Sequence, residues 1–363
     1  MRFIDEYRDP ELVRKLLDAV HALAAKIGRP ITLMEICGTH THAIGRFGIR
    51  RLLPENIRLI SGPGCPVCVT SISDVDRALY LAERPNVLFA TFGDMLRVPG
   101  TGGRSLQQMR AAGADIRIVS SALDALSLAE ANPAREILFL GIGFETTAPT
   151  VASTLQSARR KGLTNFSVFS VHKTVSPAIQ ALLDDPELNI DGFLCPGHVS
   201  VITGTDAYRS IPAAGRSAVI TGFEPVDIID GILMSLQQIR EGRYEVAIQY
   251  ARGVSQEGNR RARESMAEVF EPDDATWRGL GLIPESGLSI RREYASMNAL
   301  NRFPLPGIPS VEFEGCRCGD ILRGVISPPE CRLFRKACTP VNPIGPCMVS
   351  SEGTCSAYLK YEA

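Results

Sequence analysis

Short apolar runs alternate with helical stretches along the first two thirds of this sequence, and this alternation restricts the fold more than any other feature. The runs are about six residues long and apolar throughout, which is typical of strands buried on both faces of a parallel sheet. Alternating strands and helices predict an α/β fold. The expected strands are 32–37, 57–61, 86–92, 115–120, 136–142, 166–172, 192–195 and 217–222.

Two of these expected strands are followed by similar residues. Leu88-Phe-Ala-Thr-Phe-Gly-Asp94, with Pro99 beyond it, resembles Leu138-Phe-Leu-Gly-Ile-Gly-Phe-Glu145, with Pro149 beyond it. This weak repeat predicts two similar parallel-sheet domains whose strand ends face a shared cleft, the usual place for a ligand in α/β proteins.

The same patterns predict the domain boundaries. Residues 11–27 have helical apolar spacing that stops at Gly28, so an N-terminal helix is expected, packed on the third domain. The two α/β units are expected to be consecutive and to meet near residue 120. The expected divisions are 1–28 for the helix, 29–120 and 121–230 for the α/β domains, and 231–363 for the third domain.

Charge and hydropathy exclude several classes of partner. The formal net charge is −1, with no long run of either sign, which argues against nucleic acid because phosphate binding needs a basic face. No apolar run approaches the roughly 18 residues that span a bilayer. The first residues lack the apolar core of a secretory signal. We therefore expect a soluble, cytoplasmic protein without a membrane partner.

The cysteines are concentrated near the C-terminus. Six of the ten lie in the last 48 residues, a stretch that is also rich in Pro and Gly. In a reducing compartment such clustering indicates metal ligation or redox chemistry. A segment of this kind needs a metal or disulfides to hold one conformation.

The first motif that carries chemistry is Glu35-Ile-Cys-Gly-Thr-His-Thr-His42. It follows an expected strand, so Cys37 falls at the carboxyl end of that strand, on the ligand side of a parallel sheet. Cysteine and histidine together suit iron or zinc. Alternatively, His40 and His42 cap the following helix or hydrogen-bond the loop.

A second motif, Gly62-Pro-Gly-Cys-Pro-Val-Cys68, also follows an expected strand. The arrangement of Cys65 and Cys68 is that of a redox dithiol at the start of a helix, whose N-terminus stabilises a thiolate. Half of a zinc site has the same spacing, but no second Cys-x-x-Cys exists to complete it.

Three further polar residues follow expected strands and can reach the same cleft. They are Asp94, Glu145 and His198. The alternative for the two acidic residues is helix capping. The glycine patterns match neither the dinucleotide fingerprint nor the Walker loop, so we expect no nucleotide site.

The C-terminal cysteines leave two metals open. Four thiolates suit a [4Fe–4S] cluster, and two further thiols nearby would then form a reducible disulfide. Structural zinc is the competitor, although its usual paired short spacings are missing. The cysteines are Cys316, Cys318, Cys331, Cys338, Cys347 and Cys355.

Taken together, the motifs resemble the hydrogenase maturation factor HypD family. The resemblance extends to Pro196-Gly-His-Val-Ser200 and to the stretch from Cys338 through Gly345-Pro-Cys-Met-Val-Ser-Ser-Glu-Gly-Thr-Cys355. It implies two similar α/β domains with a third, cluster-bearing domain. It also implies a scaffold with redox activity, rather than a multiple-turnover enzyme, that assembles the Fe(CN)2CO unit of [NiFe]-hydrogenases with a HypC-type chaperone and a HypE-type cyanide donor.

The resemblance also implies roles for individual residues. The [4Fe–4S] ligands would be Cys316, Cys331, Cys338 and Cys355. Cys318 and Cys347 would form a redox-active disulfide, and Cys65 and Cys68 a second thiol pair. Cys37, and with it His40, would bind the iron of the Fe(CN)2CO unit, while His198, Asp94 and Glu145 would line that site. We hypothesise an electron relay from the cluster through Cys318/Cys347 and Cys65/Cys68 to the nascent iron centre.

Two other classes of function fit part of the pattern. An iron–sulfur-dependent thiol–disulfide reductase of general substrates would use the same dithiol and cluster, but it leaves the Cys37 loop unexplained. A structural zinc protein that only docks partners predicts zinc and no labile sulfide.

Overall fold

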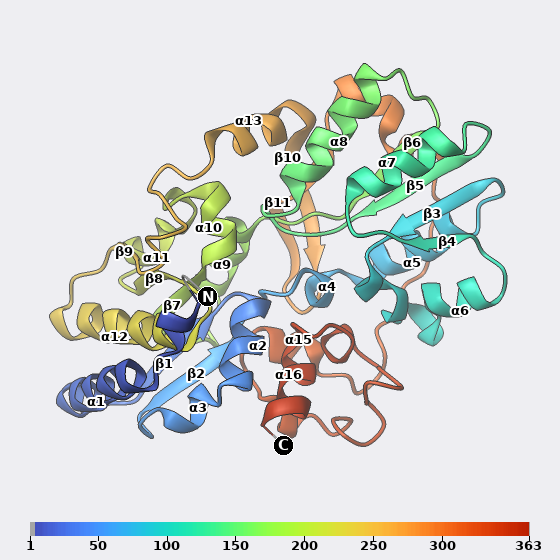
Figure 1. Cartoon of the computed structure of the whole chain (residues 1–363). Helices are drawn as coiled ribbons and strands as arrows, with labels where there is room; N and C mark the ends of the chain where they lie inside the picture. Colours follow the sequence, from blue (N-terminus) through green and yellow to red (C-terminus); the bar gives the residue numbers. More distant parts are fainter. Residues whose placement is uncertain (1–3, 363) are drawn as a thin grey trace.

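The computed structural model describes residues 4–362 and contains two parallel sheets, which confirms the α/β class (Figure 1). All eight expected runs form strands. The first sheet has the order β2-β1-β7-β8-β9, and the second has the order β4-β3-β5-β6. Their bounds are β1 Ile31–Glu35, β2 Ile57–Ser61, β3 Val87–Thr91, β4 Ile116–Ile118, β5 Glu136–Gly141, β6 Phe166–Ser170, β7 Gly192–Pro196, β8 Ser217–Thr221 and β9 Val246–Ile248.

The sheet order corrects the prediction of consecutive units meeting near residue 120. The chain leaves the first sheet after β2, builds the whole second sheet, and returns through β7, which pairs with β1 in register from Leu33↔Gly192 to Glu35↔Leu194. The return is fixed by Asp191, whose carboxylate accepts the Thr32 N–H at 2.8 Å and pairs with Arg29. Because every run is similarly apolar, composition alone does not say which strands are neighbours.

Helices cover both faces of each sheet and complete three layers. On the first sheet, α1, α2 and α12 share one apolar cluster, and on the second α7 and α8 share another. The remaining apolar faces of both sheets belong to one large cluster. The helices are α1 Pro10–Ile27, α2 Gly38–Arg46, α3 Ile49–Leu52, α4 Pro66–Val69, α5 Ile72–Ala82, α6 Leu106–Ala111, α7 Ala122–Ala131, α8 Ala148–Arg160, α9 Val175–Leu183, α10 Gly197–Thr203, α11 Ser210–Ala213, α12 Pro225–Glu241, α13 Arg260–Val269, α14 Ala299–Arg302, α15 Cys318–Leu322 and α16 Thr354–Tyr361.

The N-terminal helix forms where the sequence predicts it. Asp9 accepts the backbone N–H groups of Glu11 and Leu12, and Gly28 ends the helix in the left-handed conformation at φ 67°. The helix packs on α12, which covers strands of the first sheet. The predicted boundaries placed most of α12, from residue 231 on, in the third domain.

A hairpin and a C-terminal segment complete the structure. The hairpin, β10 Phe270–Trp277 and β11 Gly281–Ile290, is antiparallel and bridges to Thr70 and to Lys173. The cysteine-rich segment contains only short helices and lies against α2 and α4 (Figure 1). Within residues 4–362, no helix is both long and apolar enough to cross a membrane.

Candidate functional site

The carboxyl ends of β1, β2, β5 and β7 surround a cavity of about 510 Å³ between the two sheets. Parallel strands bring these ends to one edge, as the sequence predicts. The loop after each strand contributes, and the C-terminal segment supplies one wall. Among the lining residues are Cys37, Gly64, Pro66, Phe144, Thr146, His198 and Glu352.

Cys37 lies directly after β1 and is the N-cap residue of α2. Its backbone N–H donates to the Glu35 carboxylate at 3.1 Å. Burial, with a smaller effect of the nearby Glu352 and Glu35 charges, raises the pKa of the Cys37 thiol to about 12. The thiol is therefore protonated at neutral pH, and a metal ion that binds the sulfur must displace that proton.

The Cys-x-x-Cys motif is held against Cys37 by glycine. The Gly38 N–H donates to the Gly64 carbonyl at 2.9 Å, and a Cβ at Gly64 would lie 2.2 Å from the Cys37 nitrogen. Any larger residue at position 64 would push the two loops apart. Cys65, the next residue, is consequently a neighbour of the Cys37 backbone.

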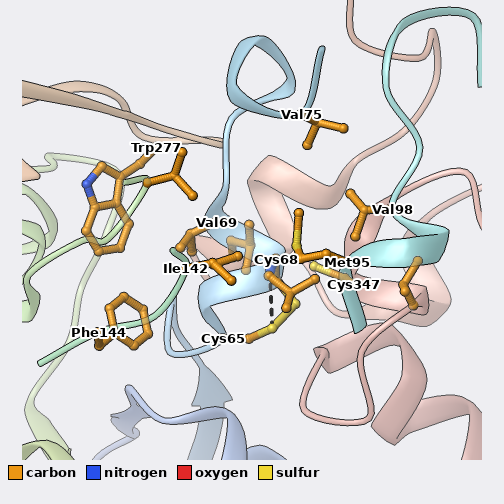
Figure 2. Close-up of a cluster of buried hydrophobic side chains, with 14 of the residues drawn as sticks. Cys65, Cys68, Val69, Val75, Met95, Val98, Ile142, Phe144, Trp277 and Cys347 are labelled. Carbon is orange, nitrogen blue, oxygen red and sulfur yellow. Dashed lines mark hydrogen bonds between the residues drawn. A yellow bond between two sulfur atoms is a disulfide. The ribbon is translucent and has the colours of Figure 1, made fainter. Parts of the chain in front are cut away.

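Cys65 and Cys68 form a disulfide at the first turn of α4 (Figure 2). The predicted placement of this pair, after a strand and at the start of a helix, is confirmed. The Cys68 N–H donates to the Cys65 sulfur at 3.2 Å. Only 3% of Cys65 and none of Cys68 is exposed, so the disulfide belongs to the core beneath the cavity.

His40 and His42, which the sequence motif offers as metal ligands, hydrogen-bond to other loops. The buried His40 ring bonds the Gly222 carbonyl through Nε2 at 2.9 Å, and its Nδ1 has no partner within the described part of the chain. Burial lowers the pKa of His40 to about 4, so the ring is neutral at pH 7. His42 reaches the Ser351 carbonyl at 3.3 Å. His198 lines the cavity. The rings of His198 and His40 both contact the Phe223 ring, with centroid distances of 4.0 and 4.7 Å.

The two predicted acidic residues do not line the cavity. Asp94 is exposed and accepts the Ser350 hydroxyl at 3.0 Å. Glu145 is buried, and its Oε1 accepts the Val175 N–H at 2.9 Å, so it caps α9 as the alternative interpretation predicts. Instead, Phe144 and Thr146, the residues on either side of Glu145, form the cavity wall at the end of β5.

Glu145 gives this protein a pH-dependent stability that can be tested. Burial raises its pKa to about 7 from 4.5. Between these values the unfolded chain loses a proton that the folded chain keeps, so the wild type loses stability as pH rises. Glu145→Gln keeps the acceptor oxygen and removes the titration. We expect its unfolding free energy, relative to wild type, to increase by up to about 3 kcal/mol between pH 4.5 and pH 8. Urea denaturation of both proteins at each pH measures this difference. If the difference between variant and wild type does not change with pH, the pKa of Glu145 is not raised in the folded chain.

Glu352 is a cavity residue that the sequence motifs did not single out. It lies between Cys347 and Cys355, accepts the Thr39 hydroxyl at 2.8 Å, and covers Gly38 so closely that a Cβ there would lie 2.5 Å from the Glu352 Cβ. Burial raises its pKa. Its signal was an acidic residue in the Ser-Ser-Glu-Gly stretch that carries part of the family resemblance, but only the fold brings that stretch to α2.

All six C-terminal cysteines line one second cavity. Cys316 is half-buried and the other five are buried. Among residues 4–362, no group of three or more His, Cys, Asp or Glu side chains is arranged to hold a single metal ion. A [4Fe–4S] cluster differs from a single ion because its four thiolates bind four separate iron atoms. The all-sulfur donor set around a common cavity fits such a cluster.

The Cys318/Cys347 pair lies on the wall of this cavity, on the side of the Cys65–Cys68 disulfide. The sulfur atoms of Cys318 and Cys347 are 2.7 Å apart, and both residues are free thiols. Cys68 Sγ lies 4.0 Å from the carbonyl of Pro346, the neighbour of Cys347 (Figure 2). The structure thus brings the Cys37 loop, the Cys65–Cys68 disulfide and the Cys318/Cys347 pair together in that order.

Comparisons with known proteins agree with the motif analysis. A HypD family model, described as "Hydrogenase formation hypA family", matches residues 11–362. The chain is 48% identical to the hydrogenase maturation factor HypD of Rhodobacter capsulatus, covering 99% of this chain and 98% of the relative. It is 47% identical to HypD2 of Bradyrhizobium diazoefficiens, with 99% and 97% coverage, and 45% identical to HypD of Escherichia coli, with 99% and 98% coverage.

Proposed function

Because this chain belongs to the HypD family of hydrogenase maturation factors, we propose that it is the scaffold on which the Fe(CN)2CO unit of [NiFe]-hydrogenases is assembled. One observation carries the proposal. Cys37 lines a cavity between the sheets while a disulfide lies in the adjacent loop, joined to it through the contact of Gly64 with Cys37. A thiol that can bind a soft metal and a dithiol that can transfer electrons therefore share one site.

In this proposal the iron is cargo and Cys37 is its anchor. Low-spin iron with cyanide and carbonyl ligands favours a soft thiolate. Iron binding displaces the thiol proton. Burial raises the pKa of Glu352 and raises that of Glu35 to about 7, so the incoming cation would favour ionisation of both carboxyl groups. His198 and His40 are both held neutral by burial, which lowers their pKa, so a ring nitrogen can accept a hydrogen bond or a metal ion.

The thiol pairs supply reducing equivalents two at a time. The Cys318/Cys347 dithiol attacks the Cys65–Cys68 disulfide; one disulfide forms, the other breaks, and two electrons with two protons pass to Cys65 and Cys68. A [4Fe–4S] cluster held by Cys316, Cys331, Cys338 and Cys355 would supply single electrons when bound. An external one-electron reductant must therefore act twice for each exchange.

Replacing Cys65 tests the thiol exchange. Cys65→Ser removes the disulfide, so we expect Cys318 and Cys347 to stay reduced and hydrogenase maturation to be lost. Alkylation and mass mapping report the thiol state, and hydrogenase activity in cells reports maturation. Cys195→Ser, another fully buried thiol, is the control that should mature hydrogenase. Normal maturation with Cys65→Ser would rule out the relay.

The burial of the disulfide argues against the general reductase. Such an enzyme must bring its dithiol into contact with a substrate protein, yet the Cys65 and Cys68 side chains are buried beneath the cavity. Turnover of an unrelated protein disulfide by the purified chain would restore that candidate.

The proposed partners are a HypC-type small chaperone and a HypE-type cyanide donor in the cytoplasm. The scaffold is tested by the infrared spectrum of the chain isolated anaerobically with the chaperone after supply of the cyanide donor. Bands from iron-bound cyanide and carbon monoxide are expected. Their absence, with the cluster intact, would overturn the scaffold function.

A further inference from the structure

Arg278 is a buried guanidinium that joins the Cys-x-x-Cys loop to the hairpin. Only 4% of its side chain is exposed. It follows β10, donates its backbone N–H to the Val69 carbonyl at 2.9 Å and its Nε–H to the Thr70 carbonyl at 3.1 Å. Both acceptors directly follow Cys68, at the end of α4.

The same residue is fixed on its other side to Glu312, just before the cysteine-rich segment. Nη1 donates to the Glu312 carboxylate at 2.6 Å. A Cβ at the adjacent Gly279 would lie 2.4 Å from the Gly319 Cα, so the hairpin backbone touches α15 next to Cys318. Arg278 is thus bound to the loop after Cys68 and to Glu312, while its neighbour Gly279 contacts α15 beside Cys318.

One nitrogen of this guanidinium, Nη2, differs from the other two. Nη2 is buried and has no hydrogen-bond partner among the described residues. Leaving a buried charged donor unpaired is costly, which indicates that another acceptor completes the site. The Gly279–Gly319 contact places the residue after Arg278 against α15, whose first residue, Cys318, lines the cysteine cavity. Arg278 therefore lies beside the wall of the cavity that the six cysteines share.

We propose that Arg278 is a positioning residue that compensates the negative charge of the cysteine-bound iron–sulfur cluster and raises its reduction potential. The inference rests on the proposed cluster. Adding an electron makes the cluster and its thiolates more negative, so a fixed positive charge in a buried site favours the reduced form. The exposed Glu312 partially offsets that charge, which predicts opposite effects for the two residues.

The test is a potentiometric titration of the full-length, cluster-loaded chain, followed by the electron paramagnetic resonance signal of the reduced cluster. For Arg278→Met we expect the equilibrium constant for reduction to fall at least tenfold, equivalent to about 59 mV for one electron. Arg278→Lys, which keeps the charge, should hold most of the wild-type potential. The matched control is Arg323→Met, which should leave the potential unchanged. Arg323 lies in the cysteine-rich segment and also pairs with a carboxylate, that of Asp185.

Glu312→Gln supplies a second, independent readout. The Glu312 side chain is 50% exposed, so the substitution should not disturb folding, and we expect the potential to rise. Unchanged potentials in both Arg278→Met and Glu312→Gln would overturn the inference. If Arg278→Met loses the cluster, Glu312→Gln decides alone. A wild-type chain without a [4Fe–4S] cluster would instead contradict the proposed function.

Discussion

Cys37→Ala is expected to abolish the infrared bands of iron-bound cyanide and carbon monoxide, and with them hydrogenase maturation. The substitution removes one sulfur atom from the cavity wall and leaves the backbone contacts of Cys37 with Gly64 and Glu35 available. A methyl group cannot replace a thiolate as a ligand for iron, so the effect should be near complete. The six cysteines of the C-terminal segment are untouched, so cluster content should be that of the wild type.

Cys195→Ala is the matched control for this experiment. Cys195 lies on β7, is fully buried, and does not line the cavity. The loss of one buried sulfur should cost both variants a similar, small amount of stability. Bands that persist in Cys37→Ala, or disappear equally in Cys195→Ala, would show that Cys37 is not the anchor.

Cys355→Ser is expected to lose the cluster and with it the order of the C-terminal segment. Cys355 lies in the first turn of α16, which packs against α2, and Glu352 lies three residues before it. Because the segment has only short helices, a cluster that joins four of its cysteines would fix their positions relative to one another. We expect loss of iron and acid-labile sulfide, and loss of amide hydrogen-exchange protection in α16, measured by mass spectrometry.

Cys318→Ser distinguishes a cluster ligand from a redox thiol in the same cavity. Cys318 lines the cavity with Cys355 and contacts Cys347, but the family resemblance does not make it a ligand. It should keep iron and sulfide while failing to mature hydrogenase. Equal loss of iron in both variants would contradict the ligand assignment. Zinc without labile sulfide in the wild type would contradict the cluster itself.

Local sequence pattern predicted the elements of the two sheets well. Each expected run became a strand, from β1 to β8, because an unbroken apolar run can be buried on both faces only in a covered sheet. The pattern missed the hairpin. Strand β10 contains Pro272, Asp273 and Asp274, and its central residues are exposed, so neither an apolar run nor a clean alternation marks it.

The positions of the motifs relative to strand ends were equally predictable. Cys37, Cys65 and His198 each follow a strand, and parallel strands end at one edge, so their approach to one region follows from local sequence. The environment of each side chain was not predictable. Asp94 and Glu145 occupy similar sequence positions, yet one is exposed beside Ser350 and the other is buried beneath α9.

The sequence by itself determined the α/β class, the eight strands, and which loops carry sulfur at the strand ends. Only the tertiary structure decided that β7 returns to β1, that Glu352 covers Gly38, and that Arg278 joins the loop after Cys68 to Glu312. The physical reason is the range of the interactions. Periodic burial depends on residues that are close in the sequence. These three contacts each join residues more than 150 positions apart, so they depend on how whole layers pack.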